Sequence, residues 1–536
     1  MNMVVHLTQL PFILEILYRC SFFFPVHVEC KHRRSLHTYT SAFHGNFLFG
    51  TASSSYQFEG AFLSDGKGLN NWDVFTHIPG NIMDGSNGDI AVDQYNRYME
   101  DLDLMNYIGV NSYRFSVSWA RILPKGRFGK VNKAGINHYN KLIDALLLKG
   151  IQPFVTLTHY DIPQELENRY GAWLSPQVKE DFKYFADICF RYFGDRVKYW
   201  ATFNEPNVMV IRGYRSGIFP PSRCSSSFGN CSSGDSEKEP FLAAHNVILS
   251  HAAAVHLYRT KYQEKQNGSV GIVMNAIWYE PFSNSLEDKL AAERAIAFYM
   301  NWFLDPIILG KYPKEMQEIL GSDLPMFSQY DMKKLKNGLD FIGINHYTSF
   351  YSKDCMFSLC EAGPGVSRTE GFSLRTPEKD GVLIGESTAV DWLYVHPQGM
   401  EKIVTYIKER YRNIPIFITE NGFGEIDDST SPTEDVLNDV KRTEYMSGYL
   451  GALETAMRKG ADVKGYFTWS LLDNFEWTSG YKIRFGIHHV DYATLMRTRR
   501  LSAMWYKQFI ANHTAQRIIA PKQNPENQKK GSFRSI

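Results

Sequence analysis

Short runs of β-branched and aromatic residues alternate along this chain with longer segments whose apolar residues recur at helical spacing. Such runs are typical of strands. We predict eight strands, at residues 47–53, 112–119, 152–160, 199–206, 269–278, 340–347, 415–422 and 465–472. Helical spacing with charged faces marks residues 93–108 and 134–149, and the second segment stops at Gly150. Strands that alternate with helices predict a parallel sheet, and eight such units close into a single (β/α)8 TIM barrel of the α/β class.

Two connections are longer than the others, residues 207–268 and 348–413. In a barrel of this kind the loops after the strands rise over the carboxyl-terminal face, so we expect these long βα loops to shape a binding site. The barrel is predicted to occupy residues 43–514 as one domain. Residues 1–42 form a lead, and the Lys-, Gln-, Asn- and Ser-rich residues 515–536 are predicted to be a disordered tail.

Composition argues against several classes of partner. Hydrophobic residues make up 44% of the chain and charged residues 21%, as in a globular protein with a large core. The net charge of +1 gives no long-range field for nucleic acid or an anionic membrane. No apolar run reaches the roughly 18–20 residues of a membrane span. Nothing in the sequence indicates a metal site or a cofactor, so we expect neither. The oligomeric state stays open.

The lead contains two short apolar patches, residues 10–17 and 22–28, which Glu15 and Arg19 interrupt. It is either an irregular secretory signal or a misassigned start. Three sequons for N-glycosylation favour secretion, and they lie at Asn230, Asn267 and Asn512. We therefore expect a protein secreted to the cell wall or extracellular space, with the vacuole as the alternative.

Two pairs of cysteines bracket short loops and bear on the same question. Cys224 and Cys231 flank a Ser- and Gly-rich loop, and Cys355 and Cys360 flank another. Because no histidine cluster accompanies them, disulfides are a better interpretation than metal ligands, and free thiols are the alternative for both pairs.

Two of the predicted strands stop at a glutamate, Glu205 in one and Glu420 in the other. Two carboxylates held rigidly at strand ends are what hydrolysis of a glycosidic bond requires. One must protonate the leaving oxygen, and the other must attack the sugar carbon or direct a water to it. Most other strands also end in, or are followed by, polar or aromatic residues, where barrels build their active sites. These residues are Gln57, Arg114, His159, Asn204, Asn345, His346, Tyr347, Trp469, Glu476 and Trp477.

Taken together, these segments resemble glycoside hydrolase family 1, and within it the plant β-glucosidases. The resemblance covers about residues 43–512, with matching motifs at 49–57, 113–116, 202–206, 345–348, 418–422 and 469–477. Residues 61–63, 69–75 and 418–424 are similar to the group that acts on monolignol glucosides such as coniferin and syringin. The resemblance implies a retaining O-β-glucosidase, which releases terminal β-D-glucose from small plant glucosides through a covalent glucosyl-enzyme.

The resemblance also implies roles for the residues around the two glutamates. Glu205 matches the general acid/base and Glu420 the nucleophile. Retention needs carboxyl groups about 5–5.5 Å apart, so their charges repel, and we expect Glu205 to be the protonated partner. Arg114, Asn345 and Tyr347 match groups that contact the nucleophile and would keep it ionised. A structural ion pair inside the barrel is the alternative for Arg114.

A second set of residues matches the groups that bind the glucose itself. Amide, imidazole and carboxylate groups suit sugar hydroxyls, and tryptophan covers the apolar face of the ring. The set is Gln57, His159, Asn204, Trp469, Glu476 and Trp477. Trp392 matches the aromatic wall of the aglycone site. Core packing is the alternative for each tryptophan.

Individual positions compared with the family pattern narrow the range of activities expected for this chain. Glu205 stands where thioglucoside-cleaving relatives carry glutamine, and retention of Glu476 argues against the phospho-glucoside branch. Tyr160 replaces the usual tryptophan of a His-Trp-Asp motif, which would reshape one wall, and the segment 497–500 replaces a Pro-Lys ending. A transglucosidase on the same fold and a non-catalytic sugar-binding barrel are the rival functions.

Overall fold

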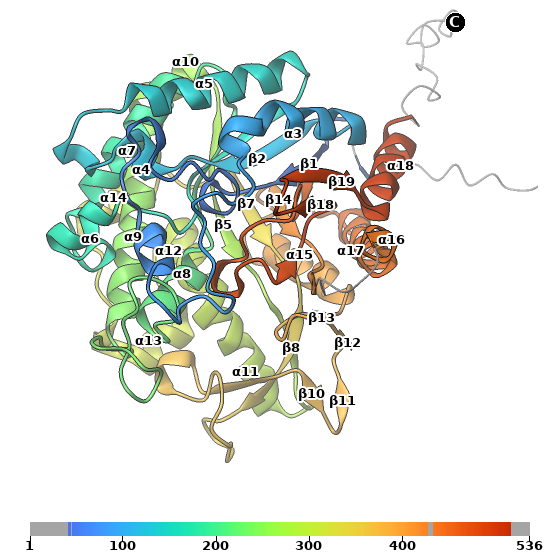
Figure 1. The fold of residues 1–536 in the computed structure, drawn as a ribbon. Helices are drawn as coiled ribbons and strands as arrows, with labels where there is room; N and C mark the ends of the chain where they lie inside the picture. The colour runs from blue at the N-terminus through green and yellow to red at the C-terminus, as the bar shows by residue number, and fades with distance from the viewer. Residues whose placement is uncertain (1–40, 44, 427–432, 516–536) are drawn as a thin grey trace, which may run out of the picture. The chain divides into compact units, whose positions relative to one another are not determined.

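The computed structural model describes residues 41–43, 45–426 and 433–515. Residues 1–40 of the predicted lead and 516–536 of the predicted tail lie outside the described residues. Eight parallel strands form a closed barrel in the order β1-β16-β14-β7-β5-β4-β3-β2 (Figure 1). They are β1 (Leu48–Ala52), β2 (Ser112–Ser116), β3 (Gln152–Thr158), β4 (Tyr199–Asn204), β5 (Ser269–Asn275), β7 (Phe341–Asn345), β14 (Ile416–Asn421) and β16 (Val463–Thr468). The predicted fold class is confirmed.

Strand boundaries differ from the prediction mainly at the carboxyl ends. The second strand stops at Ser116, and a short helix, α4 (Trp119–Ile122), follows. The eighth begins at Val463 and ends at Thr468, so residues 469–472 belong to the loop beyond it. Residues past a strand end keep strand-forming side chains because they remain buried, and composition alone does not separate the two cases.

The longer helices cover the outside of the barrel in Figure 1, and two of them are the predicted ones. Helix α3 (Gln94–Ile108) ends at Gly109, which adopts a φ of 82°, and α5 (Lys133–Leu148) begins after Asn132, whose side chain accepts from the Ala134 amide. The other long helices are α7 (Val178–Phe193), α9 (Glu239–Leu257), α11 (Leu286–Ile296), α12 (Trp302–Leu309), α15 (Gln398–Arg410), α17 (Val440–Arg458) and α18 (Leu501–Ala515).

Aromatic side chains fill the lower part of the barrel. The ring of Phe154 stacks on Tyr199 at 5.6 Å and meets Phe341, Phe417 and Phe467 edge-on at 5.2–5.4 Å between centroids. All except Tyr199 are at most 3% exposed. Because these rings close the barrel from within, space for a ligand is left only at the carboxyl ends of the strands.

The two long connections carry structure of their own. The first contains α8 (Pro206–Tyr214) and α9, and the second contains strands that extend from the barrel. A small sheet has the order β6-β8-β9, with β6 (Trp278–Pro281), β8 (Ser349–Asp354) and β9 (Ser373–Thr376). The remaining strands pair as β10 (Glu378–Lys379) with β11 (Val382–Leu383), β12 (Glu386–Ser387) with β13 (Tyr394–Val395), β15 (Glu425–Ile426) with β17 (Ile483–Arg484), and β18 (His488–Asp491) with β19 (Met496–Arg499).

Both expected cysteine pairs are bonded in the structure. The Cα atoms are 5.4 Å apart in Cys224–Cys231 and 5.5 Å apart in Cys355–Cys360. Among the described residues, Cys189 is a free thiol, and it is buried in α7. The described part of the chain also has no helix that is long and apolar enough to cross a membrane.

Candidate active site

A cavity of about 360 Å³ opens at the carboxyl ends of the barrel strands. Eight of the residues singled out from the sequence line it, namely His159, Glu205, Tyr347, Trp392, Glu420, Trp469, Glu476 and Trp477. Four others lie behind its wall, at most 2% exposed, namely Gln57, Arg114, Asn204 and Asn345. The two long connections supply much of the remaining wall, including Val208, Arg212, Phe219, Arg375 and Val390.

Glu205 stands at the junction between β4 and α8. It has a left-handed backbone (φ 41°) and caps the helix, whose first residue is Pro206. Its Oε1 accepts hydrogen bonds from the amides of Asn275 and Asn345, both at 2.9 Å, and its Oε2 accepts one from the Tyr160 hydroxyl. Three donors from three strand ends therefore fix both oxygens of this carboxyl group.

Glu420 lies near the end of β14 and is 4% exposed. Arg114 donates to its Oε1 at 2.6 Å, and the Tyr347 hydroxyl donates to its Oε2 at 2.7 Å. Burial nevertheless raises the pKa of Glu420 to about 7, against the lowering by Arg114 and with a further increase from the charge of Glu205. The two contacts were expected to keep Glu420 ionised, and in this structure the loss of hydration outweighs them.

Arg114 and Asn204 connect the two carboxylates from behind. Arg114 donates to Asn204 Oδ1 at 2.6 Å and to the Thr419 carbonyl at 3.1 Å, so it is both a contact of Glu420 and a structural link across the barrel. Asn345, expected beside Glu420, instead donates to Glu205 and to Asn204 Oδ1. The reason is local, because Thr419 donates to Asn345 Oδ1 at 2.7 Å and thereby turns the amide nitrogen toward Glu205.

The other end of the cavity is built from the loop after β16. Gln57 donates to Asn474 Oδ1 at 2.9 Å and to Glu476 Oε2 at 3.3 Å, so it positions this loop from behind the wall. The ring of His159 lies roughly parallel to Trp469 and to Trp477, with centroids 5.8 Å away in both cases. Burial, with Arg114 nearby, lowers the pKa of His159 well below its ordinary value, so the imidazole is neutral.

Glu476 is a third carboxylate in the same cavity. Burial foremost, together with the charges of Glu420 and Glu205, raises its pKa to about 8 against the lowering by Arg212. Three carboxyl groups thus share one cavity, and two of them have raised pKa values, which is common where residues are placed for chemistry.

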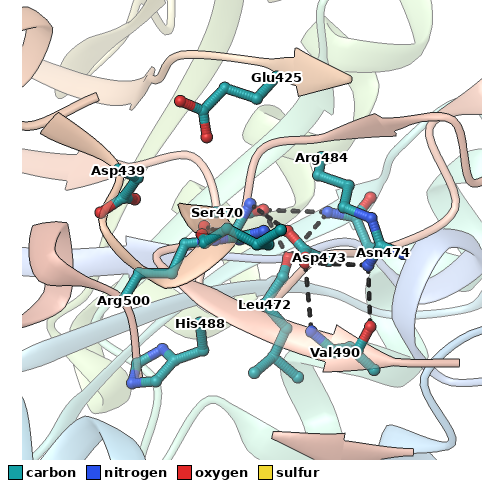
Figure 2. Close-up of polar contacts among 12 residues, drawn as sticks. Glu425, Asp439, Ser470, Leu472, Asp473, Asn474, Arg484, His488, Val490 and Arg500 are labelled. Atoms are coloured by element: carbon teal, nitrogen blue, oxygen red, sulfur yellow. Dashed lines mark hydrogen bonds and ion pairs between the residues drawn. The ribbon is translucent and has the colours of Figure 1, made fainter. Parts of the chain in front are cut away.

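A buried ion-pair network holds the loop that carries Glu476 (Figure 2). Asp473 lies between two arginines, 3.2 Å from Arg484 and 2.7 Å from Arg500, and accepts from the Gly486 and Val490 amides at 3.0 and 3.1 Å. Burial opposes ionisation, but Arg500 foremost holds the pKa of Asp473 below its ordinary value. Arg500, part of the segment that departs from the family pattern, thus anchors the loop from outside the cavity.

Trp392 stands at the opening of the cavity. It is 37% exposed and meets Tyr347 edge-on at 5.7 Å, so it is not a core residue. Its loop lies between β12 and β13 in the second long connection.

Three cavity residues were missed or undervalued in the sequence. Tyr160 was noted only as a departure, yet it bonds Glu205 directly. Asn275 ends β5, so the strand-end rule that found the other polar residues could have found it. Tyr299 donates to Asn275 Oδ1 at 2.9 Å from a helical segment, and no sequence pattern marks it. Among the described residues no group of three or more acidic, histidine or cysteine side chains is arranged to hold a metal ion.

A closed parallel barrel with two buried glutamates sharing one polar cavity at the strand ends has the architecture of a glycoside hydrolase. A family model described as glycosyl hydrolase family 1 matches residues 39–515. This chain therefore belongs to glycosyl hydrolase family 1.

Individual relatives refine the comparison. The chain is 63% identical to β-glucosidase 47 of Arabidopsis thaliana (91% of this chain, 88% of the relative) and 53% identical to coniferin β-glucosidase of Pinus contorta (87% and 92%). It is 56% identical to a protein of Oryza sativa subsp. japonica named probable inactive β-glucosidase 14 (89% and 92%). A rice β-glucosidase variant in covalent complex with glucose superposes with a TM-score of 0.84 at 46% identity, over 87% of this chain and 98% of that one.

Proposed function

We propose that this chain is a retaining O-β-glucosidase in which Glu420 attacks the anomeric carbon and Glu205 protonates the departing oxygen. Water then enters with Glu205 as the base and releases β-glucose from the glucosyl-enzyme. The observation that carries the proposal is the unlike surroundings of the two carboxylates. Glu420 is held by a cation and a phenol, whereas neutral donors hold Glu205 at the start of a helix.

Membership of the family does not by itself establish catalytic activity, because one relative at 56% identity is named a probable inactive enzyme. In this chain both carboxylates are present and buried, and a chain of hydrogen bonds through Arg114, Asn204 and Asn345 joins them. Burying charged groups destabilises the folded state, so this arrangement is expected where the groups take part in catalysis and not in a non-catalytic barrel.

Glucose recognition is assigned to the end of the cavity formed by His159, Trp469, Glu476 and Trp477, with Gln57 and Asn204 supporting them from behind. His159 Nδ1 has no hydrogen-bond partner among the described residues, as expected of a group whose partner is a substrate hydroxyl. The indole faces suit the apolar face of a pyranose.

For the leaving group we propose a monolignol glucoside of the coniferin type. The relative from Pinus contorta, named for coniferin, supports this substrate, and so does the exposed Trp392 in a cavity that Val208, Ile211 and Val390 also line. Trp392→Ala is expected to change the ranking among aglycones, lowering kcat/KM about 5- to 100-fold for coniferin, the scale of one buried side chain, and sparing methyl β-glucoside. An equal loss on both substrates would place the aglycone elsewhere.

The nucleophile is tested with Glu420→Ala. The variant should lose hydrolysis, and added azide should restore turnover and yield α-glucosyl azide, because the small anion attacks from the face that Glu420 occupied. Glu409→Ala, on the exposed side of α15, is the matched control and should behave as the wild type. A β-configured azide product would assign the nucleophile to another residue.

We further propose that residues 43–514 form the catalytic domain and that the protein is secreted to the cell wall or vacuole. The match of the family model over residues 39–515 supports the first statement, and the two disulfides support the second because such bonds persist in oxidising compartments.

A further inference from the structure

Two arginines line the cavity without a carboxylate partner. Arg212 and Arg375 are half-buried, and neither forms an ion pair with any residue that the structure describes. The fully or nearly fully buried arginines behave differently, since Arg114, Arg121 and Arg294 each meet a carboxylate within 3 Å. A partly desolvated guanidinium without a counter-charge is costly, so these two groups need an explanation.

Both arginines belong to the part of the cavity wall that the two long connections supply. Arg212 follows Glu205 by two turns of α8, and that helix presents Val208 and Ile211 to the cavity as well. A chain of hydrogen bonds runs from Glu205 through Asn275 to the Tyr299 hydroxyl. The charges of Arg375 and Arg212 both act on that phenol, so the two guanidinium groups lie around it.

Each guanidinium lies over an aromatic ring that also lines the cavity. Arg212 lies over Phe219 and Arg375 over Phe350, each with its central carbon 5.0 Å from the ring centroid. Stacking orients a guanidinium and leaves its edge free to donate to a ligand, which is the geometry that recognises a carboxylate.

The competing explanation for the two arginines is that their positive charges balance the negative charges of the three glutamates in the cavity. It accounts for Arg212 in part, because the charge of Arg212 acts on Glu476. It explains Arg375 less well, because Arg375 is among the main charges acting on Tyr279 and Tyr299 and is not among the main influences on the pKa of Glu420 or Glu476.

We propose that the leaving-group end of the cavity accepts β-glucosides whose aromatic aglycone ends in a carboxylate, bound by Arg212 and Arg375. The inference rests on the proposed glucosidase function and adds a second class of aglycone to the monolignol glucosides proposed above. A monolignol ends its side chain in a neutral alcohol, and the hydroxycinnamic acid of the same skeleton ends it in a carboxylate. The apolar walls would hold the aromatic ring that both aglycones share, and the two arginines would distinguish the carboxylate of the acid from the alcohol of the monolignol.

The test compares kcat/KM for three glucosides of one skeleton, namely coniferin, the 4-O-β-glucoside of ferulic acid and the methyl ester of that acid. The wild type should prefer the acid over the ester. Arg212→Gln and Arg375→Gln should each lower the ratio of kcat/KM for the acid to kcat/KM for the ester about 10- to 100-fold, the range for loss of a hydrogen bond between charged groups. Because Arg375 is not among the main influences on the pKa of Glu476, Arg375→Gln should change turnover of the ester less than about 3-fold.

Control measurements separate the effect of losing a guanidinium charge from the effect of misfolding. Turnover of the ester reports a folded site in each variant, Arg212→Lys should keep part of the preference, and Arg412→Gln, at an exposed position outside the cavity, should keep all of it. Equal kcat/KM for acid and ester in the wild type, or a preference that survives both glutamine variants, would overturn the inference while leaving the glucosidase intact. Failure to hydrolyse any β-glucoside, including 4-nitrophenyl β-glucoside, would instead overturn the proposed function and the inference with it.

Discussion

Replacing Glu476 by glutamine removes one of the three carboxylates in the cavity and nearly keeps its shape. The amide oxygen can still accept from Gln57, so the loop should stay in place. In the wild type, burial raises the pKa of Glu476 from an ordinary value of 4.5 to about 8. The folded state therefore binds a proton more tightly than the unfolded chain, and this residue makes the protein less stable as pH rises from 4.5 to 8.

The size of the effect follows from that difference in pKa. At about 1.4 kcal/mol per pKa unit, the contribution of Glu476 to the free energy of unfolding would fall by about 3 kcal/mol between pH 5 and 7.5. Glu476 is only part-buried because it faces the cavity, so we discount this to between about 1.5 and 3 kcal/mol. For a chain of this length, with an unfolding entropy of roughly 1 kcal/mol per kelvin, that corresponds to about 1.5–3 °C in Tm.

The assay is the melting temperature of wild type and Glu476→Gln at pH 5 and at pH 7.5 in the same ionic strength. The variant should gain about 1.5–3 °C relative to the wild type on going to the higher pH, while its kcat/KM falls on every β-glucoside. Glu409→Gln, at an exposed position, is the control and should show no pH-dependent gain. If the difference in Tm between Glu476→Gln and wild type is the same at both pH values, burial does not set the ionisation of Glu476 and the reasoning fails.

Three further predictions concern the remaining parts of the site. Glu205→Gln should slow glucosides of basic leaving groups by orders of magnitude and affect aryl leaving groups of low pKa far less in the first step, because only a basic oxygen needs the proton; equal losses in pre-steady-state kinetics would contradict this. Tyr160→Phe removes one of the three donors to Glu205 and should lower kcat about 10- to 100-fold with little change in KM, the range for one hydrogen bond to a charged group, whereas a rise in KM alone would mean that Tyr160 only shapes the wall. Peptide mapping without reduction should recover Cys224 and Cys231 as one linked pair, and recovery of both as free thiols would remove that support for secretion.

The interactions around the two carboxylates could not be predicted residue by residue. Asn345 was expected at Glu420 and bonds Glu205, because a hydroxyl from the neighbouring strand decides which way its amide points. Tyr160 reaches Glu205 from the end of β3, 45 residues away in sequence. The raised pKa of Glu420 depends on how much water its neighbours exclude, and no motif contains that quantity.

The sequence by itself determined the barrel and the position of the two glutamates within it. Alternating strand and helix patterns require a parallel sheet, and the end of a parallel strand is a fixed place, so Glu205 and Glu420 had to meet at one face. Only the tertiary structure decided what surrounds them. Arg212 and Arg375 come from connections whose course depends on long-range packing and not on local periodicity, and only the folded chain shows that neither pairs with an acidic side chain among the described residues.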